Sequence, residues 1–467
     1  MKKLSLLFVL FQFLFIVNAE IKLPTFFASG MVLQQQTIAK IWGKADPNKK
    51  VTLSTEWNNK KYSTIADQNG HWKLTFSTTA AGGPYKMVIS DGKALTLSNV
   101  LLGEVWLCSG QSNMEMPMKG YSGQPVTGSN FDILNSENSQ IRIYTAPRKA
   151  AHEPQYDIDA AWQESKPETV RNFSATAYYF GRLLQQSLKV PVGLINVSWG
   201  GSMVEAWMTK EMLSEFPEVI IPSKTEEITK MKNPQHVPTI LYQGMMHPLV
   251  GYTIKGVIWY QGESNRFHPE SYAAMFRSMM KGWRNAWNQK DTIPFYYCQI
   301  APYVYEKNVE SAFLREAQAQ VANDPYVGMA VLMDTGEEKI IHPAKKREAG
   351  ERLAFLALNK TYQLKGIDSE SPVFKNIEIK GNEVTVNFDK APLGIYAPNT
   401  ESKLFMLAGE DKIFYPAKAI VNRTKVVVTS EAVPNPVAVR YAFQNYVVGD
   451  LFGTSGLPVS SFRSDNW

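Results

Sequence analysis

The sequence predicts an α/β fold in which a parallel sheet, covered by helices, is flanked by N-terminal and C-terminal antiparallel β-domains. Apolar and polar residues alternate in 20–98, give way to apolar runs separated by helical patterns from about 99 to 365, and alternate again in 370–467. Fully apolar strands interleaved with helices are typical of parallel sheets buried on both faces. The length of 467 residues also exceeds what one hydrophobic core usually supports, so several domains are expected.

Residues 1–19 have the three parts of a secretory signal. Lys2 and Lys3 form a positive start, Leu4 to Val17 form an apolar run, and Val17-Asn-Ala19 offers a small-residue cleavage site. The run is short for a membrane span, and no later segment is long enough for one. We therefore expect export to the periplasm or the extracellular space, with an N-terminal anchor as the alternative and no membrane span in the mature protein.

The two flanking β-domains are expected from strands that each have one apolar face. In 20–98, a turn at Asp67-Gln-Asn-Gly70 leads into a strand whose apolar residues are Trp72, Leu74 and Phe76. In 370–467, the corresponding faces are formed by Val384, Val386 and Phe388 and by Val437, Val439, Tyr441 and Phe443.

The central α/β domain, 99–365, is expected from five apolar strands and four helices. The strands are Val105–Cys108, Val192–Val197, Val257–Tyr260, Phe295–Gln299 and Val327–Met333. The helices lie near Thr176–Leu188, Glu270–Trp287, Val309–Val321 and Lys345–Leu358. A proline-rich segment, 206–240, is expected as an excursion from this domain. Ligands bind beyond the carboxyl ends of parallel strands, so functional side chains are expected in the loops that follow them.

Composition excludes several classes of partner. The net charge is +6, but the Lys and Arg residues form no basic stripe along the sequence, so no nucleic-acid partner is expected. Two cysteines and six scattered histidines have no zinc-ligand spacing, so we expect no metal and no other cofactor. Cys108 and Cys298 lie in apolar strand-like segments, and they form either a disulfide or two buried thiols. The sequence specifies no oligomeric state.

Ser112 follows the first central strand, in the segment Gly103–Met114. A serine at the carboxyl end of a buried strand can face a crevice, while its own N–H lines an anion site. With Glu115 it also forms a capping-box pattern, so a helix cap is the alternative role. The two roles are compatible, because a cap brings N–H groups and positive dipole to the same place.

Four separated blocks carry a resemblance to a known family. They are Met31-Val-Leu-Gln34, Gly103–Met114, Trp259-Tyr-Gln-Gly-Glu-Ser-Asn265 and the segment from Ile341-His-Pro-Ala-Lys-Lys to Ala354. In this order they resemble the SGNH (GDSL-like) esterases, and among them the sialate O-acetylesterase and carbohydrate acetylesterase family. The Gly-x-Ser-x-Gly elbow is absent, which argues against an α/β-hydrolase. The resemblance implies an SGNH-type sheet and an enzyme that hydrolyses carboxylic esters of sugars.

The resemblance implies that Ser112 is the nucleophile and His342 is the base. His342 lies between the last central strand and a helix, at the same sheet edge as Ser112, with His247 and His268 as rivals. SGNH enzymes commonly place Asp three residues before this histidine, where the chain has Lys339, which cannot orient an imidazolium.

The third member of a triad is therefore open. Glu338 is one candidate, Glu337 and Asp334 are alternatives, and a Ser-His dyad held by a backbone carbonyl is equally expected.

The expected oxyanion donors are the N–H groups of Ser112 and Gly201 and the side-chain amide of Gln261. A glycine in Ser198-Trp-Gly-Gly-Ser-Met203 lets the backbone approach a ligand closely. The family takes a further donor from the Asn of a Gly-x-Asn block, where this chain has Ser264, so Ser264 and Asn265 are alternatives to Gln261. Glu263 is expected as a buried structural acceptor.

The implied reaction is acyl transfer from an acetylated glycan. The resemblance makes O-acetylated sialic acid the leading substrate, and Arg266 is the candidate clamp for its carboxylate. Acetylated xylan or another glycan fits the same catalytic groups without a clamp. A catalytically degenerate secreted carbohydrate-binding protein is the alternative from another class, supported by the missing Asp before His342.

Overall fold

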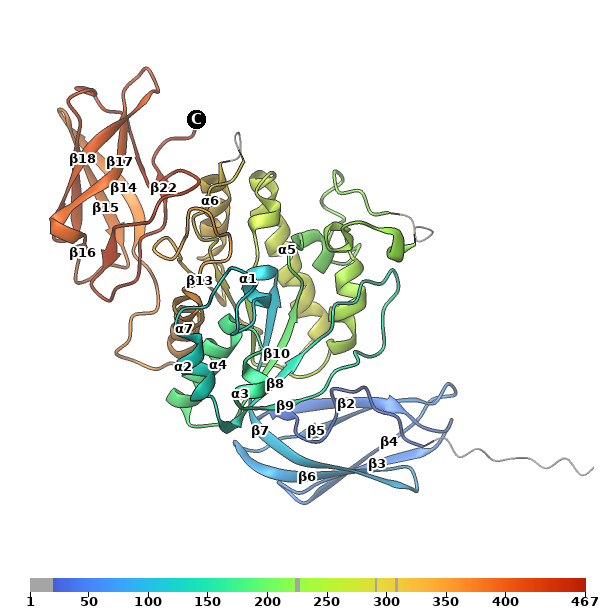
Figure 1. Cartoon of the computed structure of the whole chain (residues 1–467). Coiled ribbons are helices and arrows are strands. Elements are labelled where there is room, and N and C mark those ends of the chain that lie inside the picture. The colour runs from blue at the N-terminus through green and yellow to red at the C-terminus, as the bar shows by residue number, and fades with distance from the viewer. Residues whose placement is uncertain (1–19, 223–226, 290–291, 307–309) are drawn as a thin grey trace, which may run out of the picture.

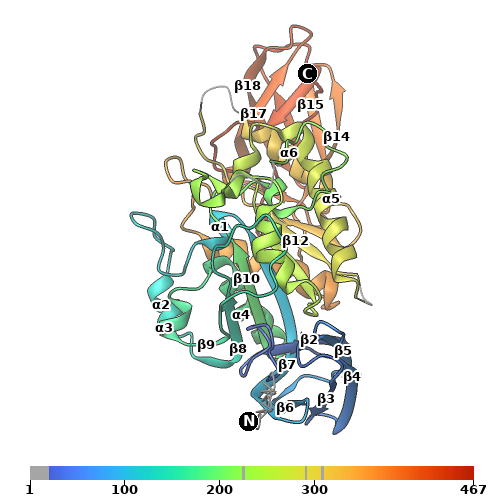
Figure 2. The ribbon, with the colours of Figure 1, turned by 90° about the vertical axis from the view of Figure 1, so that its right-hand side faces the viewer.

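The computed structural model describes residues 20–222, 227–289, 292–306 and 310–467, and the expected signal segment 1–19 lies outside them. A central part of helices and strands lies between two parts made of strands, one N-terminal and one C-terminal (Figure 1). Figure 2 shows the same three parts in a row from the side, with the long strand β7 (Ala94–Gly110) running from the N-terminal part into the centre.

The N-terminal part consists of strands that pair antiparallel, except for β1, which pairs in parallel with β7. They are β1 (Val32–Gln34), β2 (Ile38–Lys44), β3 (Lys50–Thr55), β4 (Lys60–Ile65), β5 (His71–Ser77) and β6 (Gly82–Ser90). β2 pairs with β5, while β3 pairs with both β4 and β6. Trp72, Leu74 and Phe76 are buried on one face of β5, as the alternation predicts.

Strand β7 (Ala94–Gly110) joins the N-terminal part to the centre. Its first half pairs antiparallel with β6, and its second half pairs in parallel with two central strands. The expected domain boundary at 98/99 lies inside this strand. One continuous strand therefore carries the chain from the first β-part directly to Ser112.

The central sheet has the order β13-β12-β11-β7-β10-β8-β9. Its other strands are β8 (Asn138–Thr145), β9 (Gln163–Ser165), β10 (Val192–Ser198), β11 (Gly256–Tyr260), β12 (Phe295–Cys298) and β13 (Val327–Ala330). All are parallel to β7 except β9, which runs antiparallel to β8. The five expected strands are present. β8 was not expected, because its first three residues, Asn138 to Gln140, are polar.

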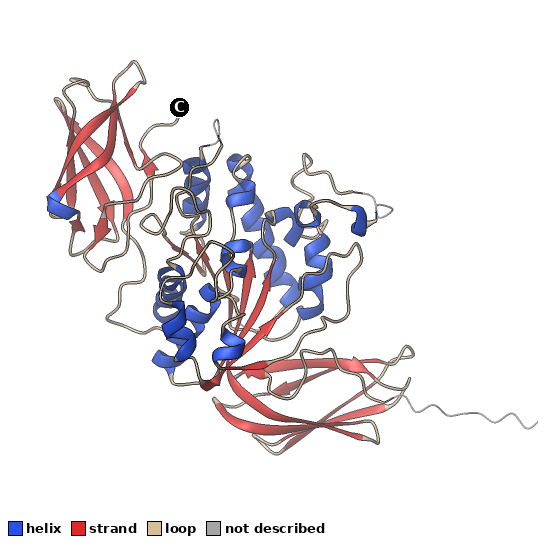
Figure 3. Ribbon diagram, viewed as in Figure 1, coloured by secondary structure: helices blue, strands red, loops and turns tan. Residues whose placement is uncertain are grey.

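Helices cover both faces of this sheet (Figure 3). The longer ones are α4 (Ala175–Leu188), α5 (Pro269–Trp287), α6 (Ser311–Val321) and α7 (Lys346–Leu356), and the short ones are α1 (Ser112–Glu115), α2 (Ser129–Leu134) and α3 (Pro167–Val170). α4 and α7 share a buried core with Trp106 and Cys108 of β7, whereas α5 and α6 share another with Leu107. Successive residues of β7 thus face opposite cores, which is why its sequence is apolar throughout.

Short 3-10 and π turns complete the described helical structure. They span Val204–Trp207, Ile228–Lys230, Pro234–His236, Tyr242–Met246, His247–Leu249, Glu263–Asn265, Ala357–Thr361 and Pro398–Thr400. Several of them lie in the expected excursion 206–240, whose residues 223–226 are outside the described ranges.

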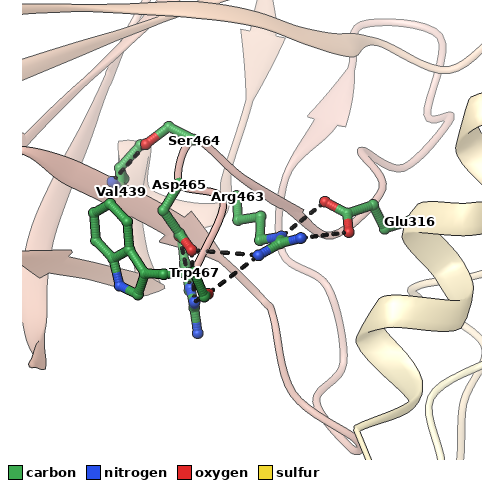
Figure 4. Close-up of polar contacts among 7 residues, drawn as sticks. Glu316, Val439, Arg463, Ser464, Asp465 and Trp467 are labelled. Carbon is green, nitrogen blue, oxygen red and sulfur yellow. Dashed lines mark hydrogen bonds and ion pairs between the residues drawn. The ribbon is translucent and has the colours of Figure 1, made fainter. Parts of the chain in front are cut away.

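The C-terminal part is a seven-stranded antiparallel sheet with the order β14-β15-β19-β18-β17-β20-β22. The strands are β14 (Val373–Lys380), β15 (Glu383–Asp389), β17 (Glu401–Ala408), β18 (Phe414–Asn422), β19 (Lys425–Thr429), β20 (Ala438–Tyr441) and β22 (Phe462–Arg463), with a separate pair β16 (Ile395–Tyr396) and β21 (Phe452–Gly453). Arg463 ties this sheet to the centre, because its guanidinium donates to both carboxylate oxygens of Glu316 on α6, at 2.9 and 3.0 Å (Figure 4).

Cys108 and Cys298 are free and buried, so the disulfide alternative is excluded. They lie on β7 and β12, which are separated in the sheet by β11. Burial raises the pKa of both thiols. Among the described helices, none has the length and apolarity needed to cross a bilayer.

Candidate active site

Three adjacent strands end at the same level and carry most of the site. Gly110 of β7 is paired with Ser198 of β10 on one side and with Tyr260 of β11 on the other. After β7 the chain forms β8, β9 and β10 on one side of this strand, and later β11, β12 and β13 on the other side. The carboxyl end of β7 is therefore a topological switch point, which is where open α/β sheets bind ligands. A side chain at Gly110 would place its Cβ 2.2 Å from the Tyr260 carbonyl oxygen, so only glycine allows this turn.

The loops after these strands surround a pocket of about 410 Å³. It is lined by Gln111, Ser112, Glu115, Tyr121, Arg148, Gly200, Gly201, Glu263, Ser264, Arg266, Ile341 and His342. Of the six residues assigned to the site from the sequence, the pocket brings together Ser112, Gly201, Arg266 and His342, but not Gln261 or Glu338. A larger cleft of about 700 Å³ lies at the opposite, amino-terminal end of the central strands and contains none of them.

Ser112 is the first residue of α1 and is half-buried. The capping position belongs to Gln111, which makes no side-chain capping bond, so the helix-cap role expected as an alternative for Ser112 is wrong. The Ser112 hydroxyl has no hydrogen-bond partner within the described chain. It is thus free to react with a molecule in the pocket.

His342 faces the same pocket and is held by a neutral amide. Its Nδ1 lies 2.5 Å from Oε1 of Gln124, and its ring lies edge-on to Tyr121 at 5.2 Å between centroids. When Nδ1 carries the proton and donates it to Gln124, Nε2 is left with a lone pair. Burial, together with the positive charge of Lys346, lowers the pKa of His342 to about 4. At neutral pH the imidazole is therefore uncharged, as a base must be.

None of the acidic residues expected as a third triad member orients His342. Asp334 accepts two bonds from Arg352, at 2.7 and 2.6 Å, and Glu337 accepts the N–H of Ala344 at 2.7 Å. Glu338 is exposed, so its tentative assignment is corrected: Gln124 occupies that position instead. Gln124 is 218 residues before His342 in the chain, and no motif around it signals this contact.

The rival histidines lie elsewhere. His247 contacts the carbonyl oxygen of Gln155, and His268 pairs with Glu270 on the surface. Neither lines the pocket.

The Gly200–Gly201 turn after β10 lies against Ser112. A Cβ placed on Gly200 would be 3.3 Å from the Ser112 Cβ, and Gly201 has a left-handed φ of +75°. The Gly200 N–H donates to Glu115 at 2.8 Å, and the Ser264 hydroxyl donates to the Gly201 carbonyl at 2.8 Å. Between these two bonds, the Gly201 N–H has no partner in the described residues.

Gln261 does not reach the pocket, which corrects its assignment as an oxyanion donor. It is fully buried, and its Nε2 donates to Ser202 at 3.0 Å and to Asn265 at 2.6 Å. The Asn265 amide is likewise buried and donates to Glu205, while the Ser264 hydroxyl is used by Gly201. Of the oxyanion donors expected from the sequence, the backbone N–H groups of Ser112 and Gly201 line the pocket and have no partner among the described residues.

A buried polar cluster joins helix α1 to the loop that carries His342. Asn113 donates to Glu263 at 2.5 Å and to the Ile341 carbonyl at 3.1 Å, and Lys346 donates to Oδ1 of Asn113. Burial lowers the pKa of Lys346 to about 7 and raises that of Glu263. Glu263 acts here as a buried acceptor, and Asn113 fixes the residue next to His342.

Both arginines at the pocket are already paired. Arg266 donates to Glu306 at 3.1 and 2.7 Å and to the Glu263 carbonyl at 2.9 Å. Arg148, which the sequence did not single out, donates to both carboxylate oxygens of Glu115 at 2.7 and 2.6 Å. Neither guanidinium is an uncommitted carboxylate clamp.

The chain is similar to several known proteins. A family model described as "Carbohydrate esterase, sialic acid-specific acetylesterase" matches residues 102–359. The sialate O-acetylesterase of Homo sapiens is 27% identical over 414 residues, covering 78% of this chain and 76% of that protein. That of Mus musculus is 27% identical over 489 residues, covering 89% and 88%. The crystal structure of a carbohydrate acetylesterase from Xanthomonas citri superposes with a TM-score of 0.87 at 33% identity, covering 96% of this chain and 100% of that one.

Proposed function

The chain belongs to the sialic acid-specific acetylesterase family of carbohydrate esterases and is a carboxylic ester hydrolase, and we propose that Ser112 and His342 carry its reaction. One observation carries the proposal. Ser112 and His342, 230 residues apart by their numbers, line one pocket together with Gly201, whose N–H has no partner among the described residues.

The proposed reaction has two halves. His342 Nε2 takes the Ser112 proton as Oγ attacks the acetyl carbonyl, and the oxyanion accepts the N–H groups of Ser112 and Gly201. The imidazolium then gives its proton to the sugar oxygen, which leaves. Water, activated by His342, hydrolyses the acetyl-enzyme and releases acetate. The two side chains share no direct hydrogen bond in this part of the described structure, and such bonds are commonly loose before substrate binds.

In this proposal Gln124 replaces the carboxylate of a triad. Its amide oxygen fixes the Nδ1-protonated tautomer of His342 and stabilises the imidazolium through a dipole, not a full charge. The absence of an Asp before His342 therefore no longer argues for an inactive carbohydrate-binding protein.

For the substrate we propose an O-acetylated sugar, with O-acetylated sialic acid first because relatives carry that activity in their names. A neutral acetylated glycan is the second candidate. It is favoured by the pairing of Arg148 with Glu115 and of Arg266 with Glu306, because neither of these two guanidinium groups is then free to bind a carboxylate. Export directed by residues 1–19 is also part of the proposal.

An acetate-release panel tests this function. Acetylated sialic acids, acetylated xylan fragments and 4-nitrophenyl acetate are compared with wild type and Ser112→Ala. Release by wild type and none by Ser112→Ala supports the proposal, whereas equal release by both contradicts it. The preferred sugar decides between the two substrate candidates.

A further inference from the structure

Glu115 contacts both the nucleophile helix and the proposed oxyanion turn. It lies at the end of α1, three residues after Ser112, and its side chain is 18% exposed. Its Oε2 accepts a hydrogen bond from the Gly200 N–H at 2.8 Å. This N–H belongs to the peptide group directly before the one that carries the Gly201 N–H. The Ser264 hydroxyl donates to the Gly201 carbonyl, so the peptide groups before and after the one that carries the Gly201 N–H are both fixed. Glu115 therefore helps to set the direction of the Gly201 N–H.

A carboxylate in this position creates an electrostatic problem. A second negative charge develops on the substrate carbonyl oxygen during acyl transfer, and an unpaired Glu115 beside it would oppose that step. Arg148 meets this carboxylate with two bonds, from Nε to Oε1 at 2.7 Å and from Nη2 to Oε2 at 2.6 Å. Such a bidentate pair is strong and has no net charge.

Arg148, and with it the Glu115–Arg148 pair, also packs against the residue that precedes the Gly200–Gly201 turn. The Arg148 guanidinium lies over the ring of Trp199, 5.6 Å from its centroid, and Trp199 directly precedes Gly200. Arg148 is 53% exposed and lines the pocket.

We propose that Glu115 and Arg148 are positioning residues for the oxyanion site: Glu115 orients the Gly200–Gly201 turn, and Arg148 cancels the charge that this orientation requires. The proposal rests on the acyl-enzyme function above. It assigns the pair to the reaction, although neither residue touches the reacting atoms.

A double-mutant cycle distinguishes this role from a merely structural one. Arg148→Met leaves Glu115 charged beside the oxyanion, so kcat for 4-nitrophenyl acetate should fall by about 10- to 100-fold, with KM changed less than about threefold. Glu115→Gln keeps an oxygen acceptor for Gly200 without the charge, so its loss should be smaller. The double variant Glu115→Gln/Arg148→Met should then be more active than Arg148→Met alone.

Controls keep the outcomes separate. Arg277 of α5 forms an ion pair with Asp324 and does not line the pocket, so Arg277→Met should leave kcat unchanged. Arg148→Lys retains the positive charge and should recover most of the kcat that Arg148→Met loses. If Arg148→Met does not fold, Arg148→Lys is compared with wild type in its place. A double variant no more active than Arg148→Met, or Arg148→Met with wild-type kcat, overturns the proposal. If Ser112→Ala retains activity, the acyl-enzyme function fails instead.

Discussion

Nδ1 of His342 lies 2.5 Å from Oε1 of Gln124, so the proposed catalytic base is oriented by a neutral amide. A carboxylate at this position would raise the pKa of the imidazole, whereas an amide leaves burial and the Lys346 charge to lower it. The arrangement favours a histidine that is uncharged over a wide pH range. The consequence is a weaker base, because basicity falls with the pKa.

The first prediction concerns this contact. Gln124→Leu removes the acceptor for Nδ1, so the tautomer and the ring orientation are no longer fixed, and kcat should fall about 10- to 100-fold. Gln124→Glu places a negative charge beside the ring, so the pKa of His342 should rise and the acid limb of the kcat/KM profile should move to higher pH. An unchanged profile for both variants would show that Gln124 does not orient the base.

The second prediction concerns pH. His342 works as a base only when neutral, so activity is lost as pH falls through its pKa of about 4 and is retained above it. The acid limb of kcat/KM should therefore have its midpoint near pH 4. Lys346→Met removes a positive charge that lowers this pKa, so the midpoint should move upward, while burial still keeps it below the ordinary value. The exposed neighbour Lys345→Met is the matched control and should not move it.

The third prediction concerns the buried cluster beneath Ser112. Asn113→Leu removes the hydrogen bonds that Asn113 makes with the buried side chains of Lys346 and Glu263. Because two buried polar groups lose a partner, the free energy of unfolding should fall by about 3 kcal/mol. Chemical denaturation measures this loss. Asn172→Leu, which removes an exposed asparagine, should change stability by less than about 0.5 kcal/mol. Equal effects of the two substitutions would argue against a tightly coupled cluster.

The fourth prediction concerns the sugar. Because Arg266 is paired with Glu306 and with the Glu263 carbonyl, Arg266→Gln should leave KM for a neutral acetylated glycan within about threefold of wild type. A sialate carboxylate that displaces Glu306 would instead make KM for acetylated sialic acid rise strongly in this variant. Measuring both substrates with the same variant separates the two cases.

Sequence patterns predicted the parts of this molecule whose structure is local. Five apolar strands, four helices and the position of Ser112 at the end of β7 follow from periodicity and from turn residues. His342 was identified through the resemblance carried by its motif. β8 was missed because its polar start hides the apolar residues that follow.

Contacts between distant loops could not be predicted in the same way. Gln124 reaches His342, and Arg148 reaches Glu115, only because the fold brings separate loops to one edge of the sheet. Gln261 has the right chemistry for an oxyanion donor, but the chain turns it away from the pocket into a buried hydrogen-bond network. Residue type gives the possible chemistry, while tertiary contacts decide which groups remain free to perform it.

The most direct test of the account is to trap the acetyl-enzyme. Wild type and Ser112→Ala are mixed with 4-nitrophenyl acetate, quenched rapidly in acid and measured by intact-protein and peptide mass spectrometry. The account predicts a mass increase of one acetyl group in wild type, located on the peptide that contains Ser112, and none in the variant. An acetyl group on another residue, or turnover by Ser112→Ala, would contradict it.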